Sequence, residues 1–226
     1  MKRQGTLANF FQPSNKRPRY EKENKTIVWK SISRNNLDVR FASIFNPVCS
    51  RLYFVKLEDE LEYLAGRLAR VKVFDKYHNI PRKHAAYGDD GVKYTYSGVT
   101  VSAKPWTDTL LLIKSEVERL TASSYNFVLV NRYADGNDRM GFHKDDEKEL
   151  DLSVPIASLS LGAPRDFVFK YQDPKAGIRN ETIVLETGTL LLMEKETNNY
   201  WYHGIPQRKK CTEPRLNLTF RRIVNQ

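Results

Sequence analysis

The sequence predicts an α+β fold in which N-terminal helices precede a double-stranded β-helix, the jelly-roll arrangement of two facing sheets. Helix-like segments occur in the first half of the chain. About eight strand-like segments follow, separated by Gly, Pro, Asp and Asn turns. The twelve Tyr and eleven Phe residues also favour sheet. A run of strands of this kind closes most readily as a double-sheet jelly roll.

The first 25 residues are expected to form a disordered tail, because they are polar and contain few branched apolar side chains. Within it, Gln4, Leu7, Phe10 and Phe11 resemble the short motif by which replication and repair proteins bind the sliding clamp PCNA. The resemblance implies a helical turn that inserts the apolar side chains into a pocket. A chance cluster is the alternative. The basic residues 16–19 are similar to a nuclear import signal, which predicts a location in the nucleus.

Length and composition limit the possible structures of the chain beyond the tail. We expect one folded domain at residues 40–226, and a hydrophobic content of 40% supports a real core. No apolar run approaches the roughly 20 residues of a membrane span, and no signal-peptide pattern opens the chain. Cys49 and Cys211 lack metal-site spacing and fit a reducing compartment. We expect a monomer.

The net charge of +10 is unevenly spread. Seven basic and two acidic side chains in the first 25 residues contribute +5, and the body of the chain carries the other +5. This modest excess fits a local face that binds a polyanion. Solubility alone explains it equally well.

Two segments of the folded part have helical character. Residues 57–70 are helix-like, and residues 105–122 are a better amphipathic helix with apolar side chains three or four positions apart. Strands are predicted at residues 127–133, 156–161, 166–171, 182–185, 189–193 and 216–224.

Polar residues from two distant places form a candidate metal site. His143 and Asp145 are separated by one residue, and His203 lies 58 positions after Asp145. Two imidazoles and one carboxylate on one face of a metal make the facial triad of non-haem Fe(II) oxygenases. Taken singly, a His-x-Asp pair is usually a solvated turn, and a lone His is more often a structural residue.

An alternating segment near the C-terminus supplies a candidate anion clamp. Arg215, Asn217, Thr219 and Arg221 occupy every second position, so on a strand they share one face. Arginine on such a face suits a planar anion that accepts two hydrogen bonds. As isolated residues, the arginines would be surface charges. An open-sided metal beside a carboxylate clamp instead predicts an oxygenase that consumes 2-oxoglutarate.

Several motifs in a fixed order carry a family resemblance. The chain resembles the AlkB family of oxidative dealkylases through Asn131-Arg-Tyr133, His143-Lys-Asp-Asp-Glu147, Ser160-Leu-Gly-Ala, Arg165-Asp-Phe, Trp201-Tyr-His203 and Arg215-Leu-Asn-Leu-Thr-Phe-Arg221. The block at residues 73–98 narrows the resemblance to the nuclear DNA-repair branch of this family. The similarity covers roughly residues 40–226 and omits the tail.

The resemblance implies that the three candidate ligands hold Fe(II), with 2-oxoglutarate and O2 as co-substrates. Arg215 would pair with the carboxylate far from the metal, and Arg221 would hold the carboxylate at the metal. Support would come from Asn131, Tyr133, Asn217 and Thr219. The implied reaction oxidises an N-methyl group on a DNA base, converts 2-oxoglutarate to succinate and carbon dioxide, and releases formaldehyde from the repaired base.

The resemblance also implies substrate residues for alkylated DNA, double-stranded or single-stranded. Tyr94, Thr95 and Tyr96 belong to them, with the two phenols forming a platform for a flipped base. Without the family match, two core aromatics would be the simpler interpretation. Relatives usually carry Phe at Tyr96, and we expect the extra hydroxyl to preserve stacking and to shift lesion preference. Asp146 and Glu147 would accept the exocyclic amine of 1-methyladenine or 3-methylcytosine; solvated acids in a turn are the alternative.

Phe74 resembles the family's wedge, which fills the gap left by the flipped nucleotide. Asp75 departs from the Gly usual at that place and brings a negative charge near phosphates. Lys76 and Arg82 fit contacts with phosphate or the opposite strand. As isolated charges, they would be unremarkable.

Other functions stay open on the sequence alone. The same Fe(II) and 2-oxoglutarate chemistry could act on RNA or protein, although the wedge and the clamp motif favour replicating duplex DNA. A clamp-tethered DNA-binding protein without activity would not need its intact triad and both arginines. A zinc hydrolase would leave the paired arginines unexplained.

Overall fold

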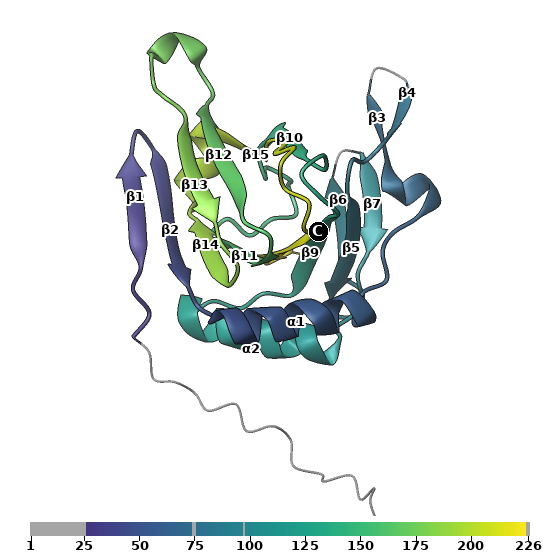
Figure 1. Cartoon of the computed structure of the whole chain (residues 1–226). Coiled ribbons are helices and arrows are strands. Elements are labelled where there is room, and N and C mark those ends of the chain that lie inside the picture. Colours follow the sequence, from purple (N-terminus) through teal and green to yellow (C-terminus); the bar gives the residue numbers. More distant parts are fainter. Residues whose placement is uncertain (1–25, 74–75, 97, 225–226) are drawn as a thin grey trace, which may run out of the picture.

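The computed structural model describes residues 26–73, 76–96 and 98–224, and most of this part is β-sheet with few helices. Two sheets face each other (Figure 1), and a cavity lined by residues of both lies between them. The predicted tail, including Gln4, Leu7, Phe10 and Phe11, lies outside the described residues. The same is true of Phe74 and Asp75. Within the described part, no helix has the length and apolar character needed to cross a membrane.

The two facing sheets have different sizes. Across the described residues, the larger sheet has the strand order β1-β2-β14-β11-β16-β9-β5-β8, and the smaller has the order β10-β15-β12-β13. The larger sheet consists of β1 (Lys30–Arg34), β2 (Leu37–Ser43), β14 (Thr189–Met193), β11 (Ile156–Gly162), β16 (Arg215–Arg221), β9 (Phe127–Tyr133), β5 (Lys83–Gly88) and β8 (Lys104–Pro105). The smaller sheet consists of β10 (Met140–His143), β15 (Trp201–Ile205), β12 (Arg165–Tyr171) and β13 (Glu181–Leu185).

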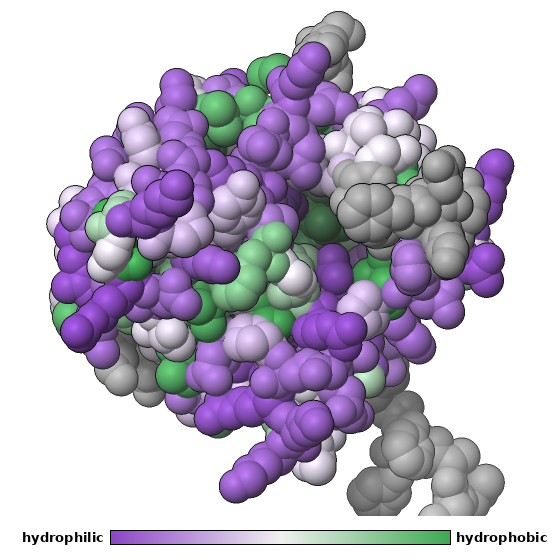
Figure 2. Space-filling view, turned by 90° about the horizontal axis from the view of Figure 1, so that it is seen from above, coloured by the Kyte–Doolittle hydropathy of each residue, from purple (hydrophilic) through white to green (hydrophobic). Residues whose placement is uncertain are grey.

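Two hairpins stand on the right of Figure 1. They are β3 (Arg70–Val73) with β4 (Lys76–Asn79), and β6 (Lys93–Tyr96) with β7 (Val99–Ser102). Short helical segments are η1 (Gly66–Ala69), η2 (Pro174–Ala176) and α3 (Lys195–Tyr200). Seen from above, the molecule is hollowed, with apolar atoms at depth and hydrophilic side chains around them (Figure 2).

The strand predictions for the second half of the chain are confirmed. Those at residues 127–133 and 189–193 agree at both bounds, and three others agree to within one residue. The last predicted strand, 216–224, is real but ends at Arg221. Beyond it the chain pairs with a different segment, through a bridge between Ile223 and Leu150. The backbone N–H of Val224 also donates to the carbonyl of Glu149.

Regular structure begins earlier than residue 40, where we expected the domain to start. Strand β2 pairs with β14 from Ser43 to Val39, and this pairing places β1 at the edge of the larger sheet. The side chains of Leu37 and Val39 are fully buried between the sheets. The amino-terminal strands therefore belong to the fold.

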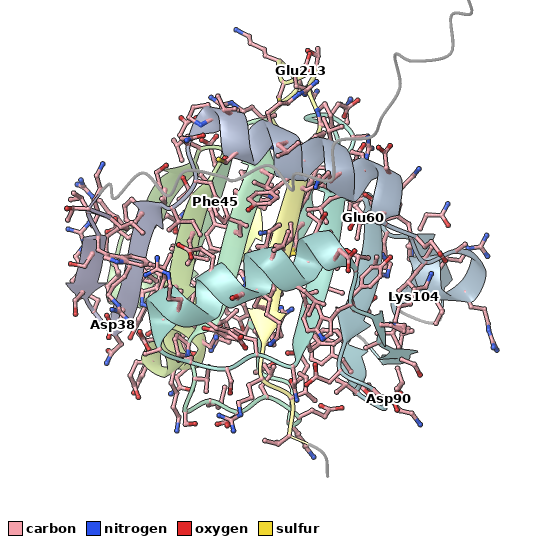
Figure 3. All side chains as sticks on the ribbon, turned by 90° about the horizontal axis from the view of Figure 1, so that it is seen from below. Asp38, Phe45, Glu60, Asp90, Lys104 and Glu213 are labelled. Atoms are coloured by element: carbon pink, nitrogen blue, oxygen red, sulfur yellow. The ribbon has the colours of Figure 1, made fainter. Side chains whose placement is uncertain are left out.

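Helices α1 (Pro47–Glu60) and α2 (Asp108–Thr121) cover the outer face of the larger sheet (Figure 3). The predicted helix at residues 105–122 is confirmed. Its hydroxyl cap, Thr107, accepts a hydrogen bond from the Leu110 N–H. The buried side chains of Ile113 and Val117 face the sheet.

The predicted helix at residues 57–70 is wrong over most of its length. Helix α1 starts at Pro47, where Asn46 accepts from the Cys49 N–H at 2.8 Å, and it ends at Glu60. Gly66, with φ of +60°, then begins a 3₁₀ turn. The helices also do not simply precede the sheets, because β1 and β2 come before α1, and β3 to β8 lie between α1 and α2.

Candidate metal centre and anion clamp

The structure brings His143, Asp145 and His203 together. Strands β10 and β15 are antiparallel neighbours that place His143 opposite His203, with ring centroids 4.3 Å apart. Asp145 follows two residues after His143. Its Oδ1 lies 3.6 Å from His143 Nε2, and its Oδ2 lies 4.0 Å from His203 Nε2. One possible ligand atom from each side chain lies within 4.8 Å of the others. The three groups therefore surround one point.

The protonation states suit a divalent cation. Burial raises the pKa of Asp145, but Arg221 and the two imidazoles outweigh this effect and hold it well below its ordinary value. Burial, reinforced by His143, lowers the pKa of His203 to about 3. His143 Nδ1 lies 3.0 Å from the carbonyl of Gly141, an acceptor that leaves Nε2 free for a metal. An ionised carboxylate and a neutral His203 imidazole fit Fe(II).

Packing holds the second imidazole in place. The His203 ring stacks on Phe167 with centroids 5.3 Å apart and planes 15° apart. Phe169 contacts it at a tilt, and the His203 side chain is 4% exposed. Metal-binding side chains that packing already holds in place need little rearrangement when the metal binds.

The alternating polar residues of β16 all lie buried in the middle of the larger sheet. Arg215, Asn217, Thr219 and Arg221 are each exposed by 6% or less. On the neighbouring β9, Tyr133 pairs with Arg215 and Asn131 pairs with Asn217, so these side chains share the inner face.

Each arginine makes one strong contact and keeps other donors unused. Arg221 Nη2 lies 2.9 Å from Asp145 Oδ2, and Arg215 Nη2 donates to Ser160 Oγ at 2.8 Å. Nε and Nη1 of both arginines are buried and have no hydrogen-bond partner among the described residues. The Tyr133 hydroxyl lies near Arg215 without making a hydrogen bond. Burial lowers the pKa of Arg215 to about 10.

These unused donors indicate a missing anion. A buried donor without an acceptor costs about 1–3 kcal/mol, so an anion that accepts from these donors would bind favourably. The cavity beside the metal ligands is lined by Asn131, Ser158, Asn217, Thr219 and Arg221 among others. Two guanidiniums at different distances from the triad fit the two carboxylates of 2-oxoglutarate.

The proposed base platform lies next to this cavity. Tyr94 and Tyr96 stack with centroids 5.7 Å apart, and the Arg221 guanidinium lies 5.3 Å from the Tyr94 ring centre. Glu147 interacts with the Tyr94 hydroxyl, and burial raises the pKa of the Glu147 carboxyl group. Thr95 points to the other face of β6, where its hydroxyl lies 2.9 Å from that of Thr100. The structure therefore separates Thr95 from the two phenols.

The remaining predicted substrate residues are dispersed. Asp146 is exposed, whereas Asp145 and Glu147 on either side of it point inward. Arg82 is not a free surface charge, because its Nε donates to Asn131 Oδ1 at 2.7 Å. Lys76 begins β4, and only its backbone position is described.

Sequence reasoning missed three groups that the structure adds. Ser158 and Ser160 on β11 lie opposite Thr219 and Asn217 on β16. Their hydroxyl oxygens accept hydrogen bonds from Asn217 and Arg215, respectively. Their alternation with leucines was a readable signal of one polar strand face. His84 on β5 is also buried, opposite Asn131. An isolated histidine of this kind gives no signal in the sequence.

Comparison with known proteins agrees with the fold and the site. Residues 57–221 match the model of the 2OG-Fe(II) oxygenase superfamily, and the chain belongs to this superfamily. It is similar to DNA oxidative demethylase ALKBH2 of Homo sapiens, with 48% identity over 87% of this chain and 77% of the relative. The Bos taurus protein of the same name is 46% identical over 88% of this chain and 73% of the relative. These matches confirm the AlkB-family resemblance and the expected use of Fe(II) and 2-oxoglutarate.

A solved structure titled "The structure of OsALKBH1" superposes with a TM-score of 0.60 at 15% identity. The superposition covers 86% of this chain and 100% of that one. At this identity, the likeness supports the fold alone.

Proposed function

We propose that this protein is a DNA oxidative demethylase that repairs N-alkylated bases such as 1-methyladenine and 3-methylcytosine by direct reversal. The observation that carries the proposal is the buried contact between Arg221 and Asp145, which joins a metal triad to an anion clamp. The similarity to two proteins named DNA oxidative demethylase supports the substrate class.

The bound metal, with 2-oxoglutarate and O2, would supply the oxidising power that hydroxylates an N-methyl group. His143, Asp145 and His203 would hold the metal. Arg221 keeps Asp145 ionised and would offer its free N–H groups to the carboxylate near the metal. Arg215, held by Ser160, would take the far carboxylate. Charge-assisted hydrogen bonds from the two arginines would thus hold both carboxylates of 2-oxoglutarate.

The base would enter from the side of the β6–β7 hairpin. Tyr96 is partly exposed and would offer a ring face on which a flipped base can stack, while Tyr94, at 1% exposed, packs behind it. Glu147 has an oxygen, Oε2, that is buried and without a hydrogen-bond partner in the described part of the chain. This oxygen could accept from an exocyclic amine, as adenine N6 and cytosine N4 provide. Burial around the site keeps water away from the reacting methyl group.

The test is a stepwise reconstitution. Fe(II) and 2-oxoglutarate are added anaerobically and their binding is measured; O2 and a duplex carrying one 1-methyladenine follow, and formaldehyde is quantified. We expect formaldehyde in proportion to repaired base. The His203→Ala variant should bind the metal poorly and release none. If binding occurs but no methylated DNA yields formaldehyde, the DNA assignment is wrong.

The same assay separates the alternatives. An RNA oligonucleotide with the same methylated base tests whether the protein acts on RNA. A peptide with a methylated lysine tests whether it acts on protein. Succinate release without any methylated substrate tests whether the centre is active at all, and its absence together with absent binding would favour a clamp-tethered scaffold.

We infer three further properties from the sequence alone: binding to PCNA, a nuclear location and a monomeric state. The motif at residues 4–11 supports capture by PCNA, and the basic cluster at residues 16–19 supports a nuclear location. A monomer is the simplest state for an enzyme recruited in this way.

A further inference from the structure

His84 is a buried titratable residue that the proposed mechanism does not use. It lies on β5, is 1% exposed, and sits opposite Asn131 in the register with β9. Directly paired residues share a sheet face, so His84 faces the same side as Asn131, which lines the metal cavity. The carbonyl of Leu68 lies near the ring, but neither ring nitrogen makes a hydrogen bond to the described residues.

The nearest aromatic neighbour of His84 is one of the platform tyrosines. The rings of His84 and Tyr96 meet edge to face, with centroids 5.8 Å apart and planes at 84°. The Tyr96 hydroxyl is buried and, like the imidazole, lacks a hydrogen-bond partner within the described part. Tyr96 stacks on Tyr94, and Tyr94 lies under Arg221, which contacts Asp145. An unbroken line of contacts thus leads from the metal ligand to His84.

Burial without partners is costly for such groups. Each unsatisfied buried polar group costs about 1–3 kcal/mol, and these two side chains leave three such atoms where their rings meet. A core residue would avoid this cost with an apolar side chain of the same shape. Groups that remain polar at a ligand cavity are explained if the ligand satisfies them.

The two walls of the pocket differ in their hydrogen-bonding character. The unpartnered Oε2 of Glu147 is an acceptor for an exocyclic amine when the carboxyl is ionised, and in that state it opposes a carbonyl oxygen. A tyrosine hydroxyl and a neutral imidazole can each donate as well as accept. Burial, followed by the charge of Arg82, lowers the pKa of His84 to about 4, so the imidazole is neutral near pH 7.

We propose that the Tyr96 hydroxyl and the His84 imidazole determine specificity by donating to a base carbonyl, which admits alkylated bases that carry a carbonyl, instead of an amine, at purine C6 or pyrimidine C4. Bases of this class are 1-methylguanine and 3-methylthymine, as opposed to the amine-bearing 1-methyladenine and 3-methylcytosine. The inference rests on the proposed demethylase function and deepens it by separating two classes of substrate.

The test compares four duplexes that are identical except for one lesion, two from each class. The full-length protein with Fe(II), 2-oxoglutarate and O2 is assayed for kcat/KM on each. Tyr96→Phe removes one oxygen atom and preserves the ring. We expect it to lower kcat/KM on the carbonyl-bearing lesions about tenfold relative to the amine-bearing ones, the effect of one lost base contact.

Two further variants keep the test independent of folding. His84→Leu should reduce the same ratio, and His84→Gln, which both donates and accepts, should restore most of it. Tyr125→Phe is the matched control, because it removes a hydroxyl that donates to the carbonyl of Pro155 away from the site. It should leave the ratio of the two lesion classes unchanged.

The outcomes separate this inference from the proposed function. If the protein repairs amine-bearing lesions but Tyr96→Phe changes all four substrates equally, or if no carbonyl-bearing lesion reacts, the specificity role is wrong and the demethylase function stands. If no lesion of either class releases formaldehyde, the proposed function itself fails.

Discussion

Arg221 and Asp145 form a fully buried pair, with Nη2 of the arginine 2.9 Å from Oδ2 of the carboxylate. The arginine side chain is 5% exposed and the carboxylate 3%. Their separation in sequence is 76 residues, so the contact exists only because β16 and the segment after β10 meet at the cavity. One residue of this pair is a candidate metal ligand, and the other belongs to the anion clamp. The contact couples the two halves of the site.

Replacing Arg221 should therefore weaken metal binding as well as co-substrate binding. In Arg221→Gln the pKa of Asp145 rises, because burial is no longer outweighed by a cation. We expect Fe(II) affinity to fall about 10–100-fold, as is typical when the partner of a ligand is lost. Anaerobic metal titration measures this. Arg222→Gln is the control, since Arg222 is 46% exposed and pairs with Asp151; equal loss in both variants would contradict the coupling.

Replacing Arg215 should weaken the binding of 2-oxoglutarate and leave metal binding unchanged. This guanidinium touches Ser160 and no candidate metal ligand, so Arg215→Ala should leave metal affinity intact. A charge-assisted hydrogen bond contributes about 1.5–3 kcal/mol, which predicts an apparent KM for 2-oxoglutarate raised by about 10–150-fold. The steady-state KM measures this, with the exposed Arg34→Ala as control. An unchanged KM would show that Arg215 does not hold the co-substrate.

His84 should make the stability of the metal-free protein depend on pH. Burial lowers its pKa from an ordinary 6.5 to about 4, so between these values the unfolded chain binds a proton that the folded chain does not. Stability from this residue is complete above about pH 6.5 and is lost as the pH falls toward 4. His84→Gln should lower the slope of unfolding free energy against pH by up to about 1.4 kcal/mol per pH unit. Urea unfolding at several pH values gives the slope, and identical slopes would refute the prediction.

The wedge assignment predicts a selective defect. Phe74→Ala should lose activity on duplex DNA and keep activity on single strands, because only in a duplex must the gap left by a flipped nucleotide be filled. The same lesion is assayed in both forms of the oligonucleotide. An equal loss on both would remove the wedge role.

The tail motif predicts a partner contact that is separate from catalysis. Replacing Phe10 and Phe11 together with Ala should abolish capture by immobilised PCNA, because these rings supply most of the apolar surface of the segment. Turnover of a short oligonucleotide without the clamp should not change. Asn15→Ala serves as the control within the tail. Persistent capture by the double variant would make the motif coincidental.

Local patterns were sufficient for much of the fold. The strand-like segments at residues 127–133 and 189–193, bounded by turn residues, predicted strands β9 and β14 at both bounds, and apolar spacing predicted α2. The amino-terminal strands β1 and β2 were missed. Strand β2 pairs with β14, which lies about 150 residues away, and β1 pairs with β2, so a distant pairing decides their structure. The helix predicted at residues 57–70 failed because the cap at Asn46 and Pro47 places the helix earlier.

The chemistry at the centre followed from residue types and their order. His143, Asp145 and His203, with arginines alternating along one strand, indicate the metal, the anion and the family from the sequence alone. Tertiary structure decided which groups touch. It linked Arg221 to Asp145, turned Thr95 away from the platform, tied Arg82 to Asn131, and buried His84 against Tyr96. Ligand identity is a property of side-chain chemistry, which a sequence states directly. Contacts, burial and pKa arise only when distant strands are packed into one low-dielectric interior.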